Sequence, residues 1–246
     1  TLTGKAAGFL GTSYGEICFN TGMTGYQEIF TDPSYYGQIM VTTNAHIGNY
    51  GCKDTEQESD GVKISGLVCK DFNLHNSRYG SDLSLQDYFF KEKIVCIYDV
   101  DTRALVRHIR DKGAMNAVIS TEQKSVKQLK EMLSEVPTME GLELSSYVST
   151  KQAYTFGDFN SPIHIAVIDY GIKKNILKSF QERGVYLKVF PMSSSLNEIL
   201  SFNPGGIFLS NGPGDPSTMH DTIASVKKII EKNIPLFGIC LGDQLI

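Results

Sequence analysis

The 246-residue sequence predicts an α/β protein of two domains, the second of them a doubly wound parallel sheet. From residue 163 onward, short apolar runs alternate with amphipathic segments, as in a parallel sheet that helices cover on both faces. Between residues 145 and 162 this pattern fades into Ser, Thr, Tyr and Gly, which is typical of a linker. We therefore assign residues 1–145 to a first domain, 146–162 to a linker and 163–246 to a second domain.

The first domain is predicted to begin with strands and structured loops, because residues 16–49 are rich in Gly, Tyr, Thr and Asn. Strands and helices alternate after that. The expected strands are residues 62–68 and 94–98, and the expected helices are residues 83–90, 102–112 and 126–133. Ser81 or Asp82 is a candidate cap for the first of these helices, and Gly113 is expected to end the second.

The second domain is predicted to consist of four strands that alternate with three helices, with right-handed crossovers. The expected strands are residues 163–168, 186–190, 206–209 and 235–239, and the expected helices are residues 173–183, 196–202 and 221–232. The carboxyl ends of such strands are where open α/β sheets bind their ligands. We therefore look for chemistry in the loops that follow them.

Composition excludes several classes of protein. The net charge of −4 argues against nucleic acid as a main partner, and no apolar run approaches the roughly 20 residues that span a bilayer. The first residues do not have the pattern of a signal peptide. The five cysteines are scattered without a CxxC pair, so we expect no metal site, no disulfide framework and a cytoplasmic location.

One cysteine is placed differently from the other four. Cys240 follows an apolar strand and has Gly238 and Gly242 two positions to either side, the G-x-C-x-G form of a nucleophile elbow. A sharp strand-to-helix turn strains the backbone and leaves no room for bulky neighbours. The helix that follows offers a positive N-terminus, which favours a thiolate. A buried structural cysteine before a loop is the alternative interpretation.

A second signal is the loop at residues 210–216, which carries two glycines and two prolines directly after a strand. A rigid loop with exposed backbone N–H groups can serve as an oxyanion hole. An ordinary connecting loop is the commoner reason for such a cluster. Its position one strand–helix unit before the cysteine elbow favours the functional interpretation, because the two loops are then neighbours in a parallel sheet.

The segments FLSNGPGDP and PLFGICLGDQL resemble the triad-type glutamine amidotransferases, whose fold is flavodoxin-like. Residues 20–28, 31–35 and 46–49 resemble the N-terminal α/β domain of carbamoyl-phosphate synthase small subunits, as do residues 66–68 and 99–103. That domain is not shared by other amidotransferases. The resemblance covers essentially the whole chain, and it implies a small-subunit domain followed by an amidotransferase domain.

The resemblance also implies roles for individual residues. Cys240 matches the nucleophile that forms a glutamyl thioester, and the glutamine-binding positions correspond to Ser34, Gly212, Gly214, Leu241 and Gln244. The ammonia released is expected to pass to a large subunit, which makes carbamoyl phosphate for arginine and pyrimidine synthesis. ATP and magnesium are expected only on that large subunit. The present sequence has no P-loop motif, and we expect no cofactor and no metal in it.

Two departures from the family are visible. Its base and orienting residue lie in a His-Pro-Glu triplet downstream of the elbow, whereas all five histidines here precede Cys240. We expect a chain that ends at Ile246 to be cut short and inactive toward glutamine. Asp243 also stands where the family usually has histidine, and its negative charge would oppose a thiolate at Cys240.

Three functional interpretations follow. The first is the glutamine-hydrolysing subunit of a carbamoyl-phosphate synthase. The second is another amidotransferase, such as those serving anthranilate or guanylate synthesis, and the block at residues 21–49 argues against it. The third is a non-catalytic interaction subunit, or an inactive fragment of the same fold, which the missing base and Asp243 favour.

Overall fold

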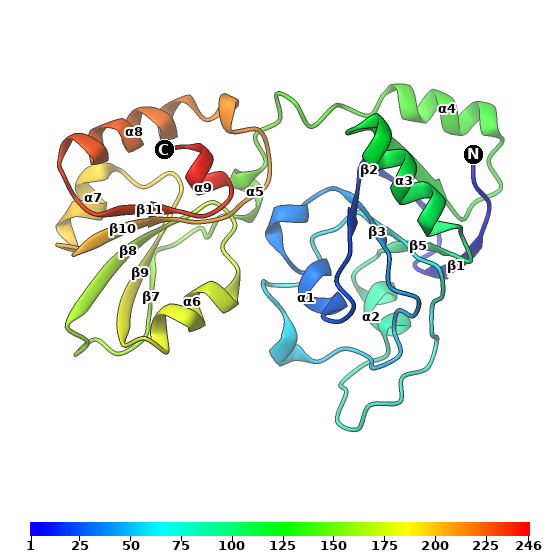
Figure 1. Cartoon of the computed structure of the whole chain (residues 1–246), viewed down its shortest axis with the longest axis horizontal. Helices are drawn as coiled ribbons and strands as arrows, with labels where there is room; N and C mark the ends of the chain where they lie inside the picture. Colours follow the sequence, from blue (N-terminus) through cyan, green and yellow to red (C-terminus); the bar gives the residue numbers. More distant parts are fainter. The chain divides into compact units, whose positions relative to one another are not determined.

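The computed structural model describes residues 1–246 and divides into two compact units, residues 1–138 and 139–246 (Figure 1). Each unit is built on its own sheet, with six strands in the first and five in the second. Parallel strands form the centre of both sheets, and helices pack on them. The predicted α/β fold class is therefore confirmed.

The first sheet has the strand order β1-β5-β4-β3-β2-β6. Its strands are β1 (Lys5–Gly8), β2 (Thr12–Asn20), β3 (Ile39–Thr42), β4 (Gly66–Val68), β5 (Val95–Tyr98) and β6 (Asn116–Ser120). The four central strands are parallel, and β1 and β6 pair antiparallel at the two edges. A parallel centre gives this unit one edge at which the carboxyl ends of β2 to β5 gather.

The helices of the first unit are α1 (Tyr26–Phe30), α2 (Leu85–Lys91), α3 (Thr102–Lys112) and α4 (Val126–Ser134), with short 3-10 turns η1 (Pro33–Tyr35) and η2 (Asp54–Glu56). One core holds Phe30 and Phe89 from α1 and α2, and the other holds Ile109 from α3. The predicted cap of α2 was wrong. Ser84 caps it instead, because its hydroxyl accepts the N–H of Asp87 at 3.0 Å.

The second sheet has the strand order β11-β10-β8-β9-β7. Its strands are β7 (Tyr154–Phe156), β8 (Ile163–Asp169), β9 (Val185–Pro191), β10 (Gly206–Leu209) and β11 (Leu236–Gly238). The four strands expected from the sequence are parallel. After β8 and β9 the chain crosses to the other side of β8 to form β10 and β11, which makes the sheet doubly wound.

The helices of the second unit are α5 (Ser145–Val148), α6 (Lys174–Gln181), α7 (Leu196–Ser201), α8 (His220–Glu231) and α9 (Leu241–Gln244), with a 3-10 turn η3 (Pro216–Thr218). Ile199, Val226 and Leu241 bring α7, α8 and α9 into one core on one face of the sheet. Leu177 brings α6 into a second core on the other face. Both faces of the central strands are thus buried, as their apolar sequences require.

The segment predicted to be an irregular linker, residues 146–162, has more structure than expected. It includes most of α5 and the whole of β7, which pairs antiparallel with β9 at the edge of the second sheet. Two bonds fasten it to that sheet: the N–H of Thr150 donates to Asp169 at 2.7 Å, and the N–H of Met192 donates to Ser149 at 3.0 Å. The composition of a short segment cannot predict hydrogen bonds to residues that are distant in the sequence.

Candidate active site

Cys240 occupies the turn between β11 and α9. Its backbone has φ 53° and ψ −114°, a combination that side-chain-bearing residues rarely adopt. Its side chain is exposed, whereas Cys52, Cys69 and Cys96 are buried and Cys18 is half-buried. The strained turn and the exposed sulfur are the features expected of a nucleophile elbow.

The glycines on either side of Cys240 allow this turn to form. A Cβ on Gly238 would overlap the backbone of Gly242 and Asp243, and a Cβ on Gly242 would overlap the carbonyl of Leu209. The first glycine lets the turn fold back on itself, and the second lets α9 lie against the end of β10. The G-x-C-x-G spacing is therefore a packing requirement at this site.

Hydrogen bonds join the elbow to the end of β10. The N–H of Ile239 donates to the carbonyl of Leu209 at 3.1 Å, and the N–H of Gly242 donates to the carbonyl of Ser210 at 3.1 Å. Since Leu209 ends β10 and Ser210 begins the glycine loop, the cysteine turn and that loop are neighbours. This is the juxtaposition expected from the sequence.

The glycine loop is held rigidly on buried polar side chains. Ser210 and Asn211 are almost fully buried. The hydroxyl of Ser210 accepts the N–H of Tyr170 at 2.8 Å and donates to the carbonyl of Asn211 at 2.7 Å. The side-chain amide of Asn211 donates to the carbonyl of Gly171 at 2.9 Å. The loop after β8 and the loop after β10 thus support each other at the carboxyl edge of the sheet.

Both loop glycines are required by close approaches. A Cβ on Gly212 would overlap the carbonyl of Tyr170, and Gly214 has φ +98° and forms an antiparallel bridge with Glu143. Neither the N–H of Gly212 nor that of Leu241 donates a hydrogen bond to another residue. Backbone N–H groups without a protein partner, one after the nucleophile and one from an adjacent loop, are the donors an oxyanion hole needs.

The structure brings five of the six candidate site residues into the second unit. Cys240, Leu241 and Gln244 belong to the elbow and α9, and Gly212 and Gly214 belong to the adjoining loop. Leu241 is buried beneath the turn, whereas Gln244 is exposed on α9. The sixth residue, Ser34, lies in η1 of the first unit, where its N–H donates to the carboxylate of Asp32 at 2.9 Å. Its role in a glutamine site stays a prediction.

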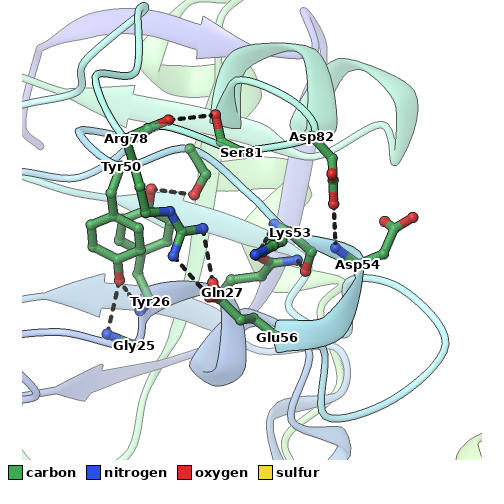
Figure 2. A network of polar contacts seen from close by, with 11 residues as sticks. Gly25, Tyr26, Gln27, Tyr50, Lys53, Asp54, Glu56, Arg78, Ser81 and Asp82 are labelled. Carbon is green, nitrogen blue, oxygen red and sulfur yellow. Dashed lines mark hydrogen bonds and ion pairs between the residues drawn. The ribbon is translucent and has the colours of Figure 1, made fainter.

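The segment that leads to Ser34 is held by a polar network that sequence reasoning missed (Figure 2). The hydroxyl of Tyr50 accepts the N–H groups of Gly25 and Tyr26 at 2.8 and 3.1 Å, at the start of α1. The rings of Tyr26 and Tyr50 stack with centroids 4.1 Å apart, and burial raises the pKa of both hydroxyls. The amide of Gln27 exchanges two hydrogen bonds with the backbone of Lys53, at 2.7 and 3.0 Å.

An ion pair closes this network. The guanidinium of Arg78 makes two bonds to the carboxylate of Glu56, at 2.8 and 3.0 Å, and lies 5.2 Å from the centre of the Tyr50 ring. The hydrogen bond to Glu56 raises the pKa of Arg78 above its usual value. Arg78 lies in an irregular loop and Glu56 ends the short 3-10 turn η2, so no local pattern in the sequence indicated that they would meet.

Two histidines lie in the second unit, and neither contacts Cys240. His164 lies in β8, near the amino end of that strand, and stacks on Phe202 with ring centroids 5.7 Å apart. His220 opens α8 and is exposed. Asp243 lies in the first turn of α9, and its backbone N–H donates to the carbonyl of Cys240 at 3.0 Å. Its side chain is exposed.

Comparison with known proteins matches each unit to a family model. Residues 1–119 match the model described as carbamoyl-phosphate synthase small chain, CPSase domain, and residues 166–246 match that of glutamine amidotransferase class-I. The carbamoyl phosphate synthase small chain of Vibrio cholerae is 42% identical, over 99% of this chain and 68% of the relative. The chain belongs to the carbamoyl phosphate synthase small chain family.

Other members of the small chain family give the same result. The small chain of Yersinia pseudotuberculosis is 42% identical over 99% of this chain, and that of a Synechococcus strain is 41% identical over 99%. The chain spans 66% of the Yersinia protein and 65% of the Synechococcus protein. The family resemblance seen in the sequence is therefore confirmed, and it rests on both units.

Two further findings concern metals and membranes. No group of three or more His, Cys, Asp or Glu side chains in the structure is arranged to hold a metal ion. No helix is both long enough and apolar enough to cross a membrane.

Proposed function

We propose that this small chain hydrolyses glutamine and supplies the ammonia for carbamoyl phosphate synthesis. The observation that carries the proposal is the strained elbow at Cys240, hydrogen-bonded through Gly242 to the glycine loop. An exposed thiol at the N-terminus of a helix, beside unpartnered backbone N–H groups, suits acyl transfer to sulfur.

The reaction begins when the Cys240 thiolate attacks the carbon of the glutamine side-chain amide, so that a C–S bond forms and the carbonyl oxygen becomes an oxyanion. The N–H groups of Gly212 and Leu241 stabilise that charge. Collapse of this intermediate breaks the C–N bond, and the protonated nitrogen leaves as ammonia. Water then hydrolyses the thioester, which releases glutamate and restores the thiol. The proton transfers need a base, which in the family belongs to a His-Pro-Glu triplet absent from these 246 residues.

The remaining site residues bind the substrate in this proposal. Gly214, Leu241 and Gln244 line the glutamine site beside Cys240, and Ser34 adds a hydroxyl from the first unit. The ammonia passes to a large subunit that holds ATP and magnesium, and the carbamoyl phosphate serves arginine and pyrimidine synthesis. The five free cysteines suit a reducing cytoplasm.

A second candidate function is a non-catalytic interaction subunit. The observation that favours it is Asp243, an exposed carboxylate in the first turn after Cys240, at the position where the family usually has histidine. In that case the family's fold and docking surface are retained without turnover. The same absence of a His-Pro-Glu base leads us to propose that a polypeptide of residues 1–246 alone is inactive.

Ammonia release from glutamine separates these possibilities. We would compare the full-length protein, its Cys240→Ser and Asp243→His variants, and the polypeptide of residues 1–246, each with and without a large subunit. The catalytic proposal predicts activity in the full-length protein that Cys240→Ser abolishes and Asp243→His increases. Activity that survives Cys240→Ser would refute the assigned nucleophile. A full-length protein that binds the large subunit but releases ammonia only as Asp243→His would favour the interaction subunit.

The role of Ser34 has its own readout in the same assay. In the full-length protein, Ser34→Ala should raise the KM for glutamine by about tenfold, the value of one substrate hydrogen bond, with a smaller effect on kcat. The neighbouring Ser59→Ala, which alters a bond to the carbonyl of Thr31, is a control for the stability of this region. An unchanged KM in Ser34→Ala would remove Ser34 from the glutamine site.

A further inference from the structure

The first unit contains a cavity of about 490 Å³ beside α3. It is lined by Thr43, Thr102, Arg103, Val106, Arg107 and Arg110. Half of these residues are arginines, and none is acidic. A cavity of this size is within the range of about 300–1,000 Å³ found for small-molecule sites.

The spacing of the arginines places them on one side of the helix. Arg103, Arg107 and Arg110 are separated by four and three residues, so their side chains project from the same face, while Ile109 is buried in the core. Arg110 pairs only with its exposed neighbour Asp111, at 3.5 Å, and Arg103 and Arg107 form no ion pair. Three positive charges, two of them unpaired, therefore line one cavity of a chain whose net charge is −4.

Two hydroxyl groups complete the lining. Thr102 is only 5% exposed, and its hydroxyl makes no hydrogen bond with the protein, although it lines the cavity. Thr43 directly follows β3, one of the parallel strands. The cavity thus lies at the carboxyl edge of that sheet, beside the first turn of α3, whose N-terminus is capped by the carboxylate of Asp101. A nearly buried hydroxyl without a protein partner, among arginines, is a donor available to a ligand.

We infer that this cavity binds an oxyanion of the phosphate class, carried by a small phosphorylated molecule. Guanidinium groups bind phosphate oxygens through paired N–H donors, and the two threonine hydroxyls can donate to the remaining oxygens. The buried position of Thr102 favours a small ligand over an acidic protein surface, which would reach the exposed guanidiniums more easily than this hydroxyl. The lining holds no histidine or carboxylate that could activate a threonine hydroxyl, so we infer binding without reaction. It is independent of the proposed glutamine chemistry.

Isothermal titration calorimetry on the chain of residues 1–246 tests this inference with two probes, inorganic phosphate and tripolyphosphate, at low ionic strength. We expect saturable binding of one tripolyphosphate per chain, with phosphate weaker. Arg107→Gln and Arg103→Gln should each weaken binding by about tenfold, since each removes a charge-assisted contact. Thr102→Val should weaken it several-fold. Lys112→Gln is the matched control, because it removes one positive charge from the last turn of the same helix outside the cavity.

Each outcome of the titration either supports the proposed site or overturns it. Loss of binding in the two arginine variants, with Lys112→Gln unchanged, supports the site. Equal weakening in all three charge variants would mean a diffuse electrostatic effect and would overturn it, as would the absence of saturable binding. A hexaglutamate peptide that binds more tightly than tripolyphosphate would replace it with a surface for an acidic protein. Circular dichroism of each variant verifies folding, which substitution of exposed arginines should not disturb.

Discussion

The N–H of Gly242 donates a hydrogen bond to the carbonyl of Ser210 across 3.1 Å. This bond joins the turn that presents Cys240 to the loop that carries Gly212. Strand pairing places them together, because β10 and β11 are parallel neighbours with Leu209 opposite Gly238. The proposed nucleophile and the proposed oxyanion donors therefore depend on one pair of strands for their relative position.

Gly242→Ala tests this dependence. An added Cβ would overlap the carbonyl of Leu209 and force α9 away from β10. We expect the free energy of unfolding to fall by about 1–3 kcal/mol, the usual cost of overpacking. Gly205→Ala is the control, because a Cβ there meets only ordinary contact, and its effect should stay within about 0.5 kcal/mol. Urea denaturation of both variants measures the difference, and equal midpoints would contradict the packing argument.

Asp169→Asn tests how the loop after β8 is held. The buried carboxylate of Asp169 accepts the N–H of Thr150 at 2.7 Å and those of Gly171 and Ile172 at 2.8 Å. An amide turns one acceptor into a donor, so at least one of these N–H groups loses its partner. We expect a loss of about 1–3 kcal/mol in the free energy of unfolding.

The control for Asp169→Asn is Asp158→Asn, an exposed carboxylate that accepts a local N–H from Asn160 at 2.9 Å. Its substitution should leave the thermal midpoint nearly unchanged, because water can replace a lost partner at the surface. If both variants lower the thermal midpoint equally, burial of the Asp169 carboxylate is not the reason for its contribution to stability.

The sequence was most informative where structure is periodic and local. The helix predicted at residues 102–112 is α3 with the same bounds, and Gly113 caps it, because apolar spacing and a terminal glycine are both short-range signals. The strand at residues 206–209 was likewise predicted with its observed bounds. By contrast, β7 was missed, since a three-residue edge strand depends on its partner β9 rather than on its own pattern.

In the candidate site, too, the short-range features could be predicted from the sequence and the long-range contacts could not. The elbow could be predicted because steric requirements on a tight turn leave a signature, namely Gly238 and Gly242 around Cys240. The network that holds the start of α1 could not, because Tyr50, Arg78 and Glu56 come from loops and a short 3-10 turn that only the folded chain brings together. Networks of this kind depend on long-range contacts, for which a single sequence holds no short-range signal.

Tyr50→Phe tests the network that holds the start of α1. The substitution keeps the stacked ring but removes the hydroxyl that accepts the N–H groups of Gly25 and Tyr26. We expect these two amides to exchange with deuterium faster by about tenfold, since each loses one hydrogen bond. Tyr79→Phe, at a fully exposed tyrosine, is the control and should leave the exchange unchanged. Unchanged protection in Tyr50→Phe would show that stacking alone holds this turn.

Thiol labelling tests whether Cys240 is the only one of the five cysteines that reacts rapidly in the folded chain. Burial raises the pKa of Cys18 and of Cys52 to about 12 and holds that of Cys96 well above its usual value. A thiol with a pKa of about 12 is a thiolate in only about one molecule in ten thousand at pH 8. We therefore expect Ellman's reagent to modify one thiol per folded chain rapidly, and Cys240→Ser to abolish that phase.

The pH dependence of labelling and of stability tests the same prediction more strictly. Between pH 7 and 9 Cys18 and Cys52 should stay slow, because their thiolates appear only as the pH approaches 12. Since these pKa values are higher in the folded chain than the usual 9.0, the folded state prefers the protonated thiols. That contribution to stability is complete below pH 9 and is lost as the pH rises from 9 toward 12. The urea midpoint should therefore fall over that interval, and Cys18→Ala with Cys52→Ala should reduce the fall. Rapid labelling of two or more thiols at pH 7 would instead show that burial does not protect the other four cysteines. Accessibility would then no longer single out Cys240 as the proposed nucleophile.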